Sequence, residues 1–266
     1  MTDRGETFAR LHQGADLLIL PNAWDALSAR IIERAGAKAI ATSSAAVAWA
    51  HGFADGQALA PELLVSTIHA IVRVVSVPVS ADIEMAYAQD ADAAGAFVAR
   101  VIDAGAVGVN IEDGSASPDL LCGKIEVAHE MAAKKDVAFW INARTDVYLK
   151  NLESGDAAFD ETVARAKRYA EQGANSIFVP GVFDKDLIGR LVRAIPLPLN
   201  VLSPKLPDGA TLKALGVRRL SAGAGIARVS YGRTEELAKA FLETGRSDLL
   251  GAGALASTDL NALMKR

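Results

Sequence analysis

Three acidic side chains follow two apolar segments of the sequence, at the points where those segments would end as strands. Asp82 and Glu84 follow the apolar run at 77–81, and Glu112 follows the run at 107–111. A strand buried in a parallel sheet excludes charge until it leaves the sheet, so we expect these carboxylates around one crevice at the strands' carboxyl ends. Clustered carboxylates repel one another unless a cation lies among them, and Mg²⁺ accepts such oxygen ligands. The pattern therefore predicts a metal-dependent enzyme with Mg²⁺ held by these three residues.

The spacing of Asp82 and Glu84 fits this site, because residues two apart lie on the same side of a chain that stays extended. The simpler alternative is that the three carboxylates are loop residues that cap the following helices. Zinc is not indicated, because the histidines have no ligand-like spacing. They are His12, His51, His69 and His129.

A basic side chain ends a further apolar run. Arg144 follows residues 138–142 and can present two parallel N–H donors to a carboxylate. A structural salt bridge to Asp146 or Glu112 is the alternative role. The two roles are compatible, because a bridged arginine is also a positioned one.

Small residues follow another predicted strand, at Ser43, Ser44 and Ala45. Their accessible backbone N–H groups and hydroxyls suit a carboxylate or phosphate oxygen, although small residues also occur where a helix packs closely. Farther along, Asp55 stands in a loop with glycines at both ends, at 52–56. We expect it to be either a mobile catalytic acid or a turn residue.

Two weaker candidates are Cys122 and the segment 221–225. A lone cysteine is more often a small buried hydrophobe than an acid or a nucleophile. The segment, Ser-Ala-Gly-Ala-Gly, is similar to the phosphate-binding turn of many barrels, but a tight turn from strand to helix needs the same residues.

The composition favours a soluble, cytoplasmic protein. The 266 residues are 51% hydrophobic and carry a formal net charge of -4, which provides no attraction to nucleic acid or an anionic membrane. The single cysteine excludes an intrachain disulfide and fits a reducing compartment. The amino terminus lacks the layout of a signal peptide, and no apolar run approaches the roughly 18 residues of a spanning helix. We expect neither nucleic acid nor a membrane as a partner.

The elements that must position these residues repeat along the chain as a helix, a glycine and an apolar strand. Gly36, Gly105 and Gly173 each close a helical pattern before a strand, where a left-handed conformation suits glycine. Helical patterns lie between the strands, for example at 157–172. Eight strands are predicted, near 16–20, 38–42, 78–82, 107–111, 138–142, 175–179, 198–202 and 218–221.

Such a set of elements forms either a (β/α)8 TIM barrel or a doubly wound sheet. We predict the barrel, because no glycine-rich dinucleotide fingerprint follows the first strand. One barrel domain is expected over residues 1–266, with a helix at 229–242 and a C-terminal helical tail at 245–266. The tail packs either on its own barrel or on another subunit.

Taken in order, the motifs resemble those of the isocitrate lyase/phosphoenolpyruvate mutase superfamily over residues 16–240. They are Pro-Asn-Ala-Trp-Asp-Ala-Leu-Ser-Ala-Arg at 21–30, the small residues at 42–45, the loop at 52–56, Asp-Ile-Glu at 82–84, Ile-Glu-Asp at 111–113 and Asn-Ala-Arg-Thr-Asp at 142–146. The resemblance implies a (β/α)8 barrel that exchanges its last helix between subunits. It also implies a homo-oligomer, either a dimer or a tetramer built as a dimer of dimers.

The same resemblance implies Mg²⁺ as cofactor and a 2-oxo carboxylic acid as substrate, with C–C or C–P bonds made or broken through an enolate. Carried over position by position, it assigns three kinds of role. The substrate-binding residues are Ser43, Ser44, Ala45 and Arg144, with the backbone N–H groups of Ser43 and Ala45 directed at the substrate carboxylate. The metal ligands are Asp82, Glu84 and Glu112, and the catalytic residues are Asp55, Arg144 and Glu112.

The sequence also departs from the family's motifs. The usual Asp-Ala-Asp-Thr-Gly is Asp-Ile-Glu-Met-Ala at 82–86, so the second metal carboxylate is longer by one methylene. The loop at 113–124 lacks the Lys-(Lys/Arg)-Cys-Gly-His of the lyase branch, and Pro180 replaces an expected histidine. Citrate-like substrates are therefore not expected.

The function expected first is a Mg²⁺-dependent lyase or decarboxylase that cleaves a C–C bond of a small 2-oxo or 2-hydroxy (di)carboxylate through an enolate. A phosphonopyruvate mutase or hydrolase is the nearest alternative. A catalytically silent binder of 2-oxo acids and an isomerase that uses the turn at 223–225 for phosphate are the others.

Overall fold

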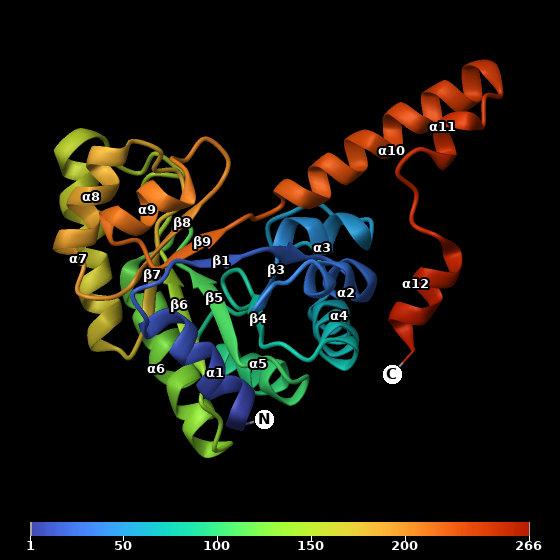
Figure 1. Cartoon of the computed structure of the whole chain (residues 1–266). Coiled ribbons are helices and arrows are strands. Elements are labelled where there is room, and N and C mark those ends of the chain that lie inside the picture. Colours follow the sequence, from blue (N-terminus) through green and yellow to red (C-terminus); the bar gives the residue numbers. More distant parts are fainter. Residues whose placement is uncertain (1, 266) are drawn as a thin grey trace.

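The computed structural model describes residues 2–265, which form a closed parallel barrel surrounded by helices (Figure 1). Its sheet has nine segments in the order β1-β9-β8-β7-β6-β5-β4-β3-β2. Two of them, β1 (Leu18–Leu20) and β2 (Asn22–Ala23), are halves of one strand separated by Pro21. Since β1 pairs with β9 and β2 with β3, the sheet closes with eight strands, and the predicted (β/α)8 barrel is confirmed.

Pro21 breaks the first strand because proline has no N–H to donate to a neighbouring strand. Its carbonyl still accepts the N–H of Ala41, at 3.1 Å. All eight predicted strands are present, with ends that differ by at most three residues. The others are β3 (Ile40–Thr42), β4 (Val79–Asp82), β5 (Gly108–Glu112), β6 (Trp140–Arg144), β7 (Ser176–Phe178), β8 (Leu199–Leu202) and β9 (Arg219–Ser221).

Helices alternate with these strands and cover the outside of the barrel, with most of the apolar core in the layer between. The helix predicted at 157–172 is α7 (Gly155–Glu171). The remaining helices up to the last strand are α1 (Thr2–Gln13), α2 (Ala26–Arg34), α3 (Ser44–Ala50), α4 (Pro61–Val74), α5 (Ala91–Asp103), α6 (Pro118–Lys134), α8 (Lys185–Ala194) and α9 (Gly209–Leu215). Among the residues described, no helix is both long and apolar enough to cross a membrane.

Helix α1 closes the amino-terminal end of the barrel. Phe8 is fully buried there, and His12 stacks on Trp140 with ring centroids 4.3 Å apart. Gly5 lets the helix approach this closely, because a Cβ at this position would overlap the carbonyl oxygen of Ala138. With this end sealed, the cavity that can receive a ligand lies at the opposite end, where the strands finish.

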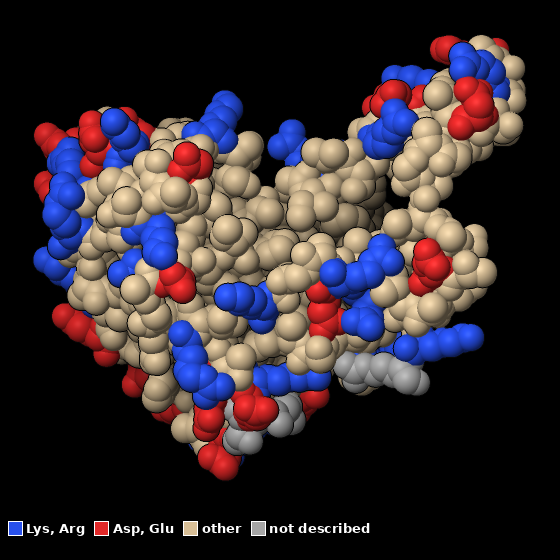
Figure 2. All heavy atoms as spheres, viewed as in Figure 1, with Lys and Arg blue, Asp and Glu red and all other residues tan. Residues whose placement is uncertain are grey.

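Helix α10 (Gly225–Thr244) follows the last strand and contains the helix predicted at 229–242, but it points away from the barrel (Figure 1). Ala227 is its one buried residue. Acidic and basic side chains mingle along the arm that it forms with α11 (Asp248–Gly251) (Figure 2). Because α10 leaves the barrel, Ile19 on β1 is 60% exposed and borders a groove of about 570 Å³.

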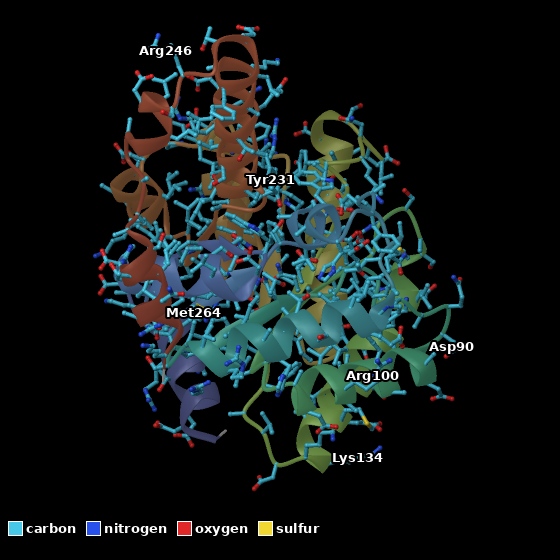
Figure 3. The ribbon with its side chains drawn as sticks, turned by 90° about the vertical axis from the view of Figure 1, so that its right-hand side faces the viewer. Asp90, Arg100, Lys134, Tyr231, Arg246 and Met264 are labelled. Carbon is cyan, nitrogen blue, oxygen red and sulfur yellow. The ribbon has the colours of Figure 1, made fainter. Side chains whose placement is uncertain are left out.

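The tail predicted at 245–266 contains α11 and α12 (Ser257–Met264), while Arg266 lies outside the described residues. The chain returns from the arm, and α12 lies beside α2, where Figure 3 labels Met264. Arg30 donates to the Leu263 carbonyl at 3.0 Å, and Met264 packs against the apolar cluster under α2. The end of the tail therefore contacts its own barrel.

Candidate active site

The carboxyl ends of the strands surround a cavity of about 190 Å³. It opens into a wider vestibule of about 830 Å³, which shares Ala45, Asp55 and Leu149 with it. Most of the residues predicted for the site line the inner cavity, but Glu84 and Glu112 do not. The lining residues are Asn22, Ser43, Ser44, Ala45, Asp55, Asp82, Asn110, Arg144, Leu149, Phe178, Leu202, Ser221, Gly223 and Ala224.

Asp82 is the last residue of β4, and its carboxylate is buried at the floor of this cavity. One oxygen, Oδ2, accepts from the Asn110 amide at 3.3 Å, and Oδ1 accepts the Glu84 N–H at 3.2 Å. Burial raises the pKa of the Asp82 carboxyl, and the nearby Arg144 guanidinium opposes that rise. Asp82 is therefore a fixed carboxylate that lacks full charge compensation.

Glu84 lies close to Asp82, but not through the extended chain expected from the sequence. Strand β4 ends at Asp82, and Glu84 has a φ of 50°, so the expectation that the two side chains project alike from an extended chain was wrong. The Glu84 side chain instead accepts a hydrogen bond from the Tyr87 hydroxyl at 2.9 Å. Burial raises the pKa of Glu84, as do the negative charges of Asp82 and Asp55, although the Tyr87 bond counteracts them.

Glu112 ends β5 and forms an ion pair with Arg144, with Oε2 and Nη1 2.7 Å apart. Burial raises the pKa of the Glu112 carboxyl to about 8 against the opposing effect of Arg144. The charges of Asp82, Asp146 and Glu84 add to the rise, which shows that these carboxylates are close enough to repel one another. A proton or a cation is needed to relieve this repulsion.

Arg144 is held by two carboxylates at once. Its Nε donates to Asp146 Oδ1 at 2.6 Å and its Nη2 to Asp146 Oδ2 at 3.1 Å, while Nη1 faces Glu112. Burial alone would lower the pKa of Arg144, but the carboxylates of Glu112, Asp146 and Asp82 outweigh it and raise the pKa. Both salt bridges considered from the sequence are therefore present, and the guanidinium is a positioned cation.

Asp113 holds Asp146, the residue that orients Arg144. This role of Asp113 was not predicted from the sequence. Its buried carboxylate accepts the Asp146 N–H at 2.9 Å, Arg165 Nη1 at 3.0 Å and the Tyr169 hydroxyl at 2.7 Å. The orientation of Arg144 is thus fixed through Asp146 by groups on α7. Asp113 and Asp146 stand beside predicted site residues in the sequence, but nothing local indicates that α7 reaches them.

A layer of asparagines at the base of the cavity was also missed. Asn142 donates to Asn110 Oδ1 at 2.8 Å and to Asn200 Oδ1 at 2.9 Å. Buried Arg219 donates to the same Asn110 oxygen at 2.9 Å, and burial lowers its pKa to about 9. These bonds turn the Asn110 NH₂ group toward Asp82. Asparagines inside otherwise apolar strands were the sequence signal for this layer.

The turn considered for phosphate binding is already occupied. The N–H groups of Ala222 and Gly223 donate to Asn22 Oδ1 at 3.0 and 2.8 Å. Helix α10 begins directly after this turn, at Gly225. The segment 221–225 therefore forms a tight turn from strand to helix around the Asn22 side chain, which is the second of the two interpretations of its sequence.

The small residues after β3 line the cavity, but one expected donor is engaged. The Ser43 N–H donates to the Ala23 carbonyl at 3.2 Å, so it is not available for a substrate carboxylate. The Ser43 hydroxyl caps α3 by accepting the Ala46 N–H. The N–H groups of Ser44 and Ala45 lie in the first turn, where a helix supplies no carbonyl partner, and remain suitable donors.

Asp55 is exposed on the loop at 52–56 and lines both the cavity and the vestibule. Gly52 and Gly56 at the ends of this loop both have positive φ, of 79° and 98°. Asp55 is also close enough to Asp82 and Glu84 to raise the pKa of each. The loop therefore carries a further negative charge to the entrance of the site.

The carboxylates fit a hard divalent cation in their chemistry. Asp82, Glu84 and Glu112 offer oxygen donors, and burial together with like charge raises the pKa of all three. Within residues 2–265, no three His, Cys, Asp or Glu side chains stand close enough together to hold a metal ion as they are. The bonds from Tyr87 to Glu84 and from Arg144 to Glu112 account for the present side-chain directions of these two carboxylates.

The chain is similar to several known proteins. A protein of Mycobacterium tuberculosis, described as uncharacterised, is 34% identical over 221 residues, which are 82% of this chain and 81% of that protein. An oxaloacetate decarboxylase of Pseudomonas aeruginosa is 34% identical over 163 residues, 56% of this chain and 53% of that one. A solved structure from Burkholderia cenocepacia, provisionally assigned as a phosphonomutase, is 37% identical with a TM-score of 0.86, covering 89% of this chain and 99% of that one.

The family model for phosphoenolpyruvate phosphomutase matches residues 8–242, which include all eight strands and every residue of the cavity. The chain belongs to the phosphoenolpyruvate phosphomutase family, within the isocitrate lyase/phosphoenolpyruvate mutase superfamily.

Proposed function

We propose that the protein is a Mg²⁺-dependent lyase or decarboxylase that cleaves a C–C bond of a small 2-oxo or 2-hydroxy (di)carboxylate through an enolate. The observation that supports this most is that Asp82 and Arg144 line one cavity of about 190 Å³. That volume is below the range of drug-sized pockets and suits a substrate of a few carbon atoms. Similarity to an oxaloacetate decarboxylase over about half the chain agrees with it.

Asp82, Glu84 and Glu112 would hold the metal, and Glu84 would leave Tyr87 to do so. When bound, Mg²⁺ would polarise the substrate carbonyl as a Lewis acid. The metal would also supply the positive charge that these three carboxylates lack.

The chain's own residues would bind the substrate and carry the charge that develops on it. The N–H groups of Ser44 and Ala45 would bind the substrate carboxylate at the start of α3. Arg144, fixed by Asp146, would face the oxygen that becomes negative in the enolate, and one such donor contributes about 3–4 kcal/mol to catalysis. Asp55, on its glycine-flanked loop, would cover the entrance as the site closes.

Turnover of oxaloacetate with and without EDTA tests this function. We expect pyruvate to form in the presence of Mg²⁺, to stop with EDTA and to return when Mg²⁺ is restored. Asp82→Asn should abolish the activity, while Asp92→Asn, an exposed aspartate on the neighbouring helix α5, should leave it unchanged. Full activity after complete metal removal would contradict the proposal.

C–P bond chemistry is the second candidate, and the similarity to the Burkholderia protein favours it. A phosphonopyruvate mutase or hydrolase would use the same cavity, with Asp55 as a participant. Release of phosphate from phosphonopyruvate, without turnover of oxaloacetate and other C–C substrates, would establish it. Tight binding of oxalate without turnover of either class would identify a silent binder of 2-oxo acids.

We also propose that the active form is a homo-oligomer, a dimer or a tetramer, in which α10 packs on a second copy. The support is that a helix of 20 residues has one buried residue, while the barrel has a groove beside Ile19. Light scattering with Leu242→Glu, which places a charge on this exposed helix, should detect loss of the oligomer. A monomer in the unaltered protein would refute this part.

A further inference from the structure

Lys124 is a buried cation that contacts the site only through the backbone. It lies on α6, and its Nζ donates to the carbonyls of Met85 and Ala88, both at 2.7 Å. Among the residues described, no carboxylate lies within ion-pair distance of it, although the negative charge of Asp90 acts on it from farther away. Burying an ammonium group is unfavourable unless its hydrogen bonds compensate. These two carbonyl bonds are therefore the direct contacts that keep the Lys124 ammonium group in place.

The two carbonyls belong to the turn at 83–88, which leads from β4 to α5 and carries Glu84. Glu84, Ala86 and Tyr87 have positive φ values of 50°, 64° and 49°. None of them is glycine, so each adopts a left-handed conformation that its Cβ disfavours. Three such residues within four positions persist only where the surroundings impose them.

Lys124 is placed to impose this conformation. Its two acceptors are the carbonyls of Met85 and Ala88, which stand immediately before and after the left-handed pair Ala86 and Tyr87. One ammonium group therefore joins both ends of this pair. Within the turn there is one further backbone bond, from the Ala86 N–H to the Ile83 carbonyl at 2.8 Å. Glu84 has the side-chain bond from Tyr87, its N–H bond to Asp82, the Glu112 N–H donated to its carbonyl at 3.0 Å and a backbone bond from Gln57. None of these bonds joins the two ends of the left-handed pair.

We propose that Lys124 is a positioning residue that clamps the turn at 83–88 and thereby fixes Glu84 for binding a divalent cation. The clamp follows from the geometry alone, whereas its role in metal binding rests on the proposed function. The loop at 113–117, which leads into α6, adjoins the same turn, because a Cβ on Gly114 would lie 3.1 Å from Met85 Sδ. A movement of α6 would therefore displace Lys124, and with it the turn that carries Glu84.

The test compares Lys124→Met with Lys134→Met, an exposed lysine on the same helix (Figure 3). Hydrogen exchange at the Ala86 amide reports the clamp, and calorimetric titration with Mg²⁺ alone reports its effect on the metal site. We expect exchange at least about tenfold faster and Mg²⁺ binding about tenfold weaker in Lys124→Met, since losing buried hydrogen bonds has at least that effect. Lys134→Met should match the unaltered protein in both measurements.

Lys124→Arg keeps two donors and should restore slow exchange and Mg²⁺ affinity, which a loss of packing alone would not explain. If Lys124→Met does not fold by circular dichroism, Lys124→Gln replaces it in the same two measurements. Unchanged exchange in the folded variant would overturn the clamp. Equal Mg²⁺ affinity in the variant and the unaltered protein would overturn the positioning role while the proposed function stands. Failure of the unaltered protein to bind Mg²⁺ would overturn both the positioning role and the proposed function, but not the clamp.

Discussion

Arg144 and Asp146 form a two-point contact in which Nε and Nη2 of the guanidinium meet the two carboxylate oxygens at 2.6 and 3.1 Å. Asp146 is fully buried, so this contact defines the plane of the guanidinium rather than merely neutralising its charge. The remaining nitrogen, Nη1, is left to face Glu112 and the cavity. Arg144 is therefore oriented before any substrate enters.

Removing the charge of Asp146 should disorient Arg144 without removing it. For Asp146→Asn we expect kcat to fall by about a hundredfold with a smaller change in KM, because misplacing a catalytic group by about 1 Å has an effect of this size. Affinity for oxalate, which mimics the enolate of pyruvate, should fall with kcat when measured by calorimetry. Asp156→Asn, which breaks an exposed ion pair with Arg190, is the matched control and should change neither. Normal oxalate affinity in Asp146→Asn would contradict this role.

Metal binding should depend on pH through Glu112. Burial raises the pKa of its carboxyl to about 8 in the metal-free protein against the opposing effect of Arg144, so below this pH a proton competes with Mg²⁺ for the carboxylate. The affinity for Mg²⁺ should therefore rise about tenfold for each pH unit up to pH 8 and then level off. Calorimetry in buffers of different ionisation enthalpy should detect release of one proton per ion.

Glu112→Gln provides the control for this pH dependence. The amide cannot release a proton, so the variant should bind Mg²⁺ more weakly and lose the part of the slope that ends near pH 8. A slope in Glu112→Gln as steep as in the unaltered protein would assign the proton to another group.

His12 should make the fold sensitive to acid. Burial, with a smaller contribution from Arg219, lowers its pKa from 6.5 to about 3. Between these values the unfolded chain binds a proton that the folded protein does not, so the free energy of unfolding falls as the pH is lowered through this range. The loss should be about 1.4 kcal/mol for each pH unit below 6.5, before other groups are counted. Urea unfolding of His12→Phe at pH 7, 5.5 and 4.5 should show a shallower decline, whereas exposed His69→Gln should decline like the unaltered protein.

The barrel could be predicted from the sequence because each strand is a short apolar run that must be buried on both sides. Gly36, Gly105 and Gly173, at φ values of 101°, 97° and 97°, mark where helices end before strands. The break at Pro21 and the departure of α10 could not be predicted in this way. Both depend on hydrogen bonds and packing with neighbouring strands and helices, which a local sequence pattern does not determine.

The candidate site, too, could be predicted from the sequence only in part. Strand ends place Asp82, Glu112 and Arg144 together because parallel strands finish at one end of a barrel, and that much follows from sequence. The direction of Glu84 could not be predicted in this way. Its left-handed conformation depends on bonds from residues distant along the chain, from Glu112 N–H to its own carbonyl and from Lys124 to the carbonyl of the next residue. The salt bridges of Arg144 were foreseeable from its neighbours, but its support through Asp113 and α7 was not.

Gly5 should be the glycine at which a methyl group is least tolerated at the sealed end of the barrel. A Cβ there would overlap the carbonyl of Ala138 just before β6, so Gly5→Ala must push α1 away from the strands. The shift would also disturb the contact between His12 and Trp140. We expect a loss of about 1–3 kcal/mol in the free energy of unfolding, as overpacking a core produces, measured by urea denaturation. Gly14→Ala, with its nearest atoms 3.8 Å from the added carbon, is the control and should lose far less. Equal stability of the two variants would show that α1 does not pack against the barrel as described.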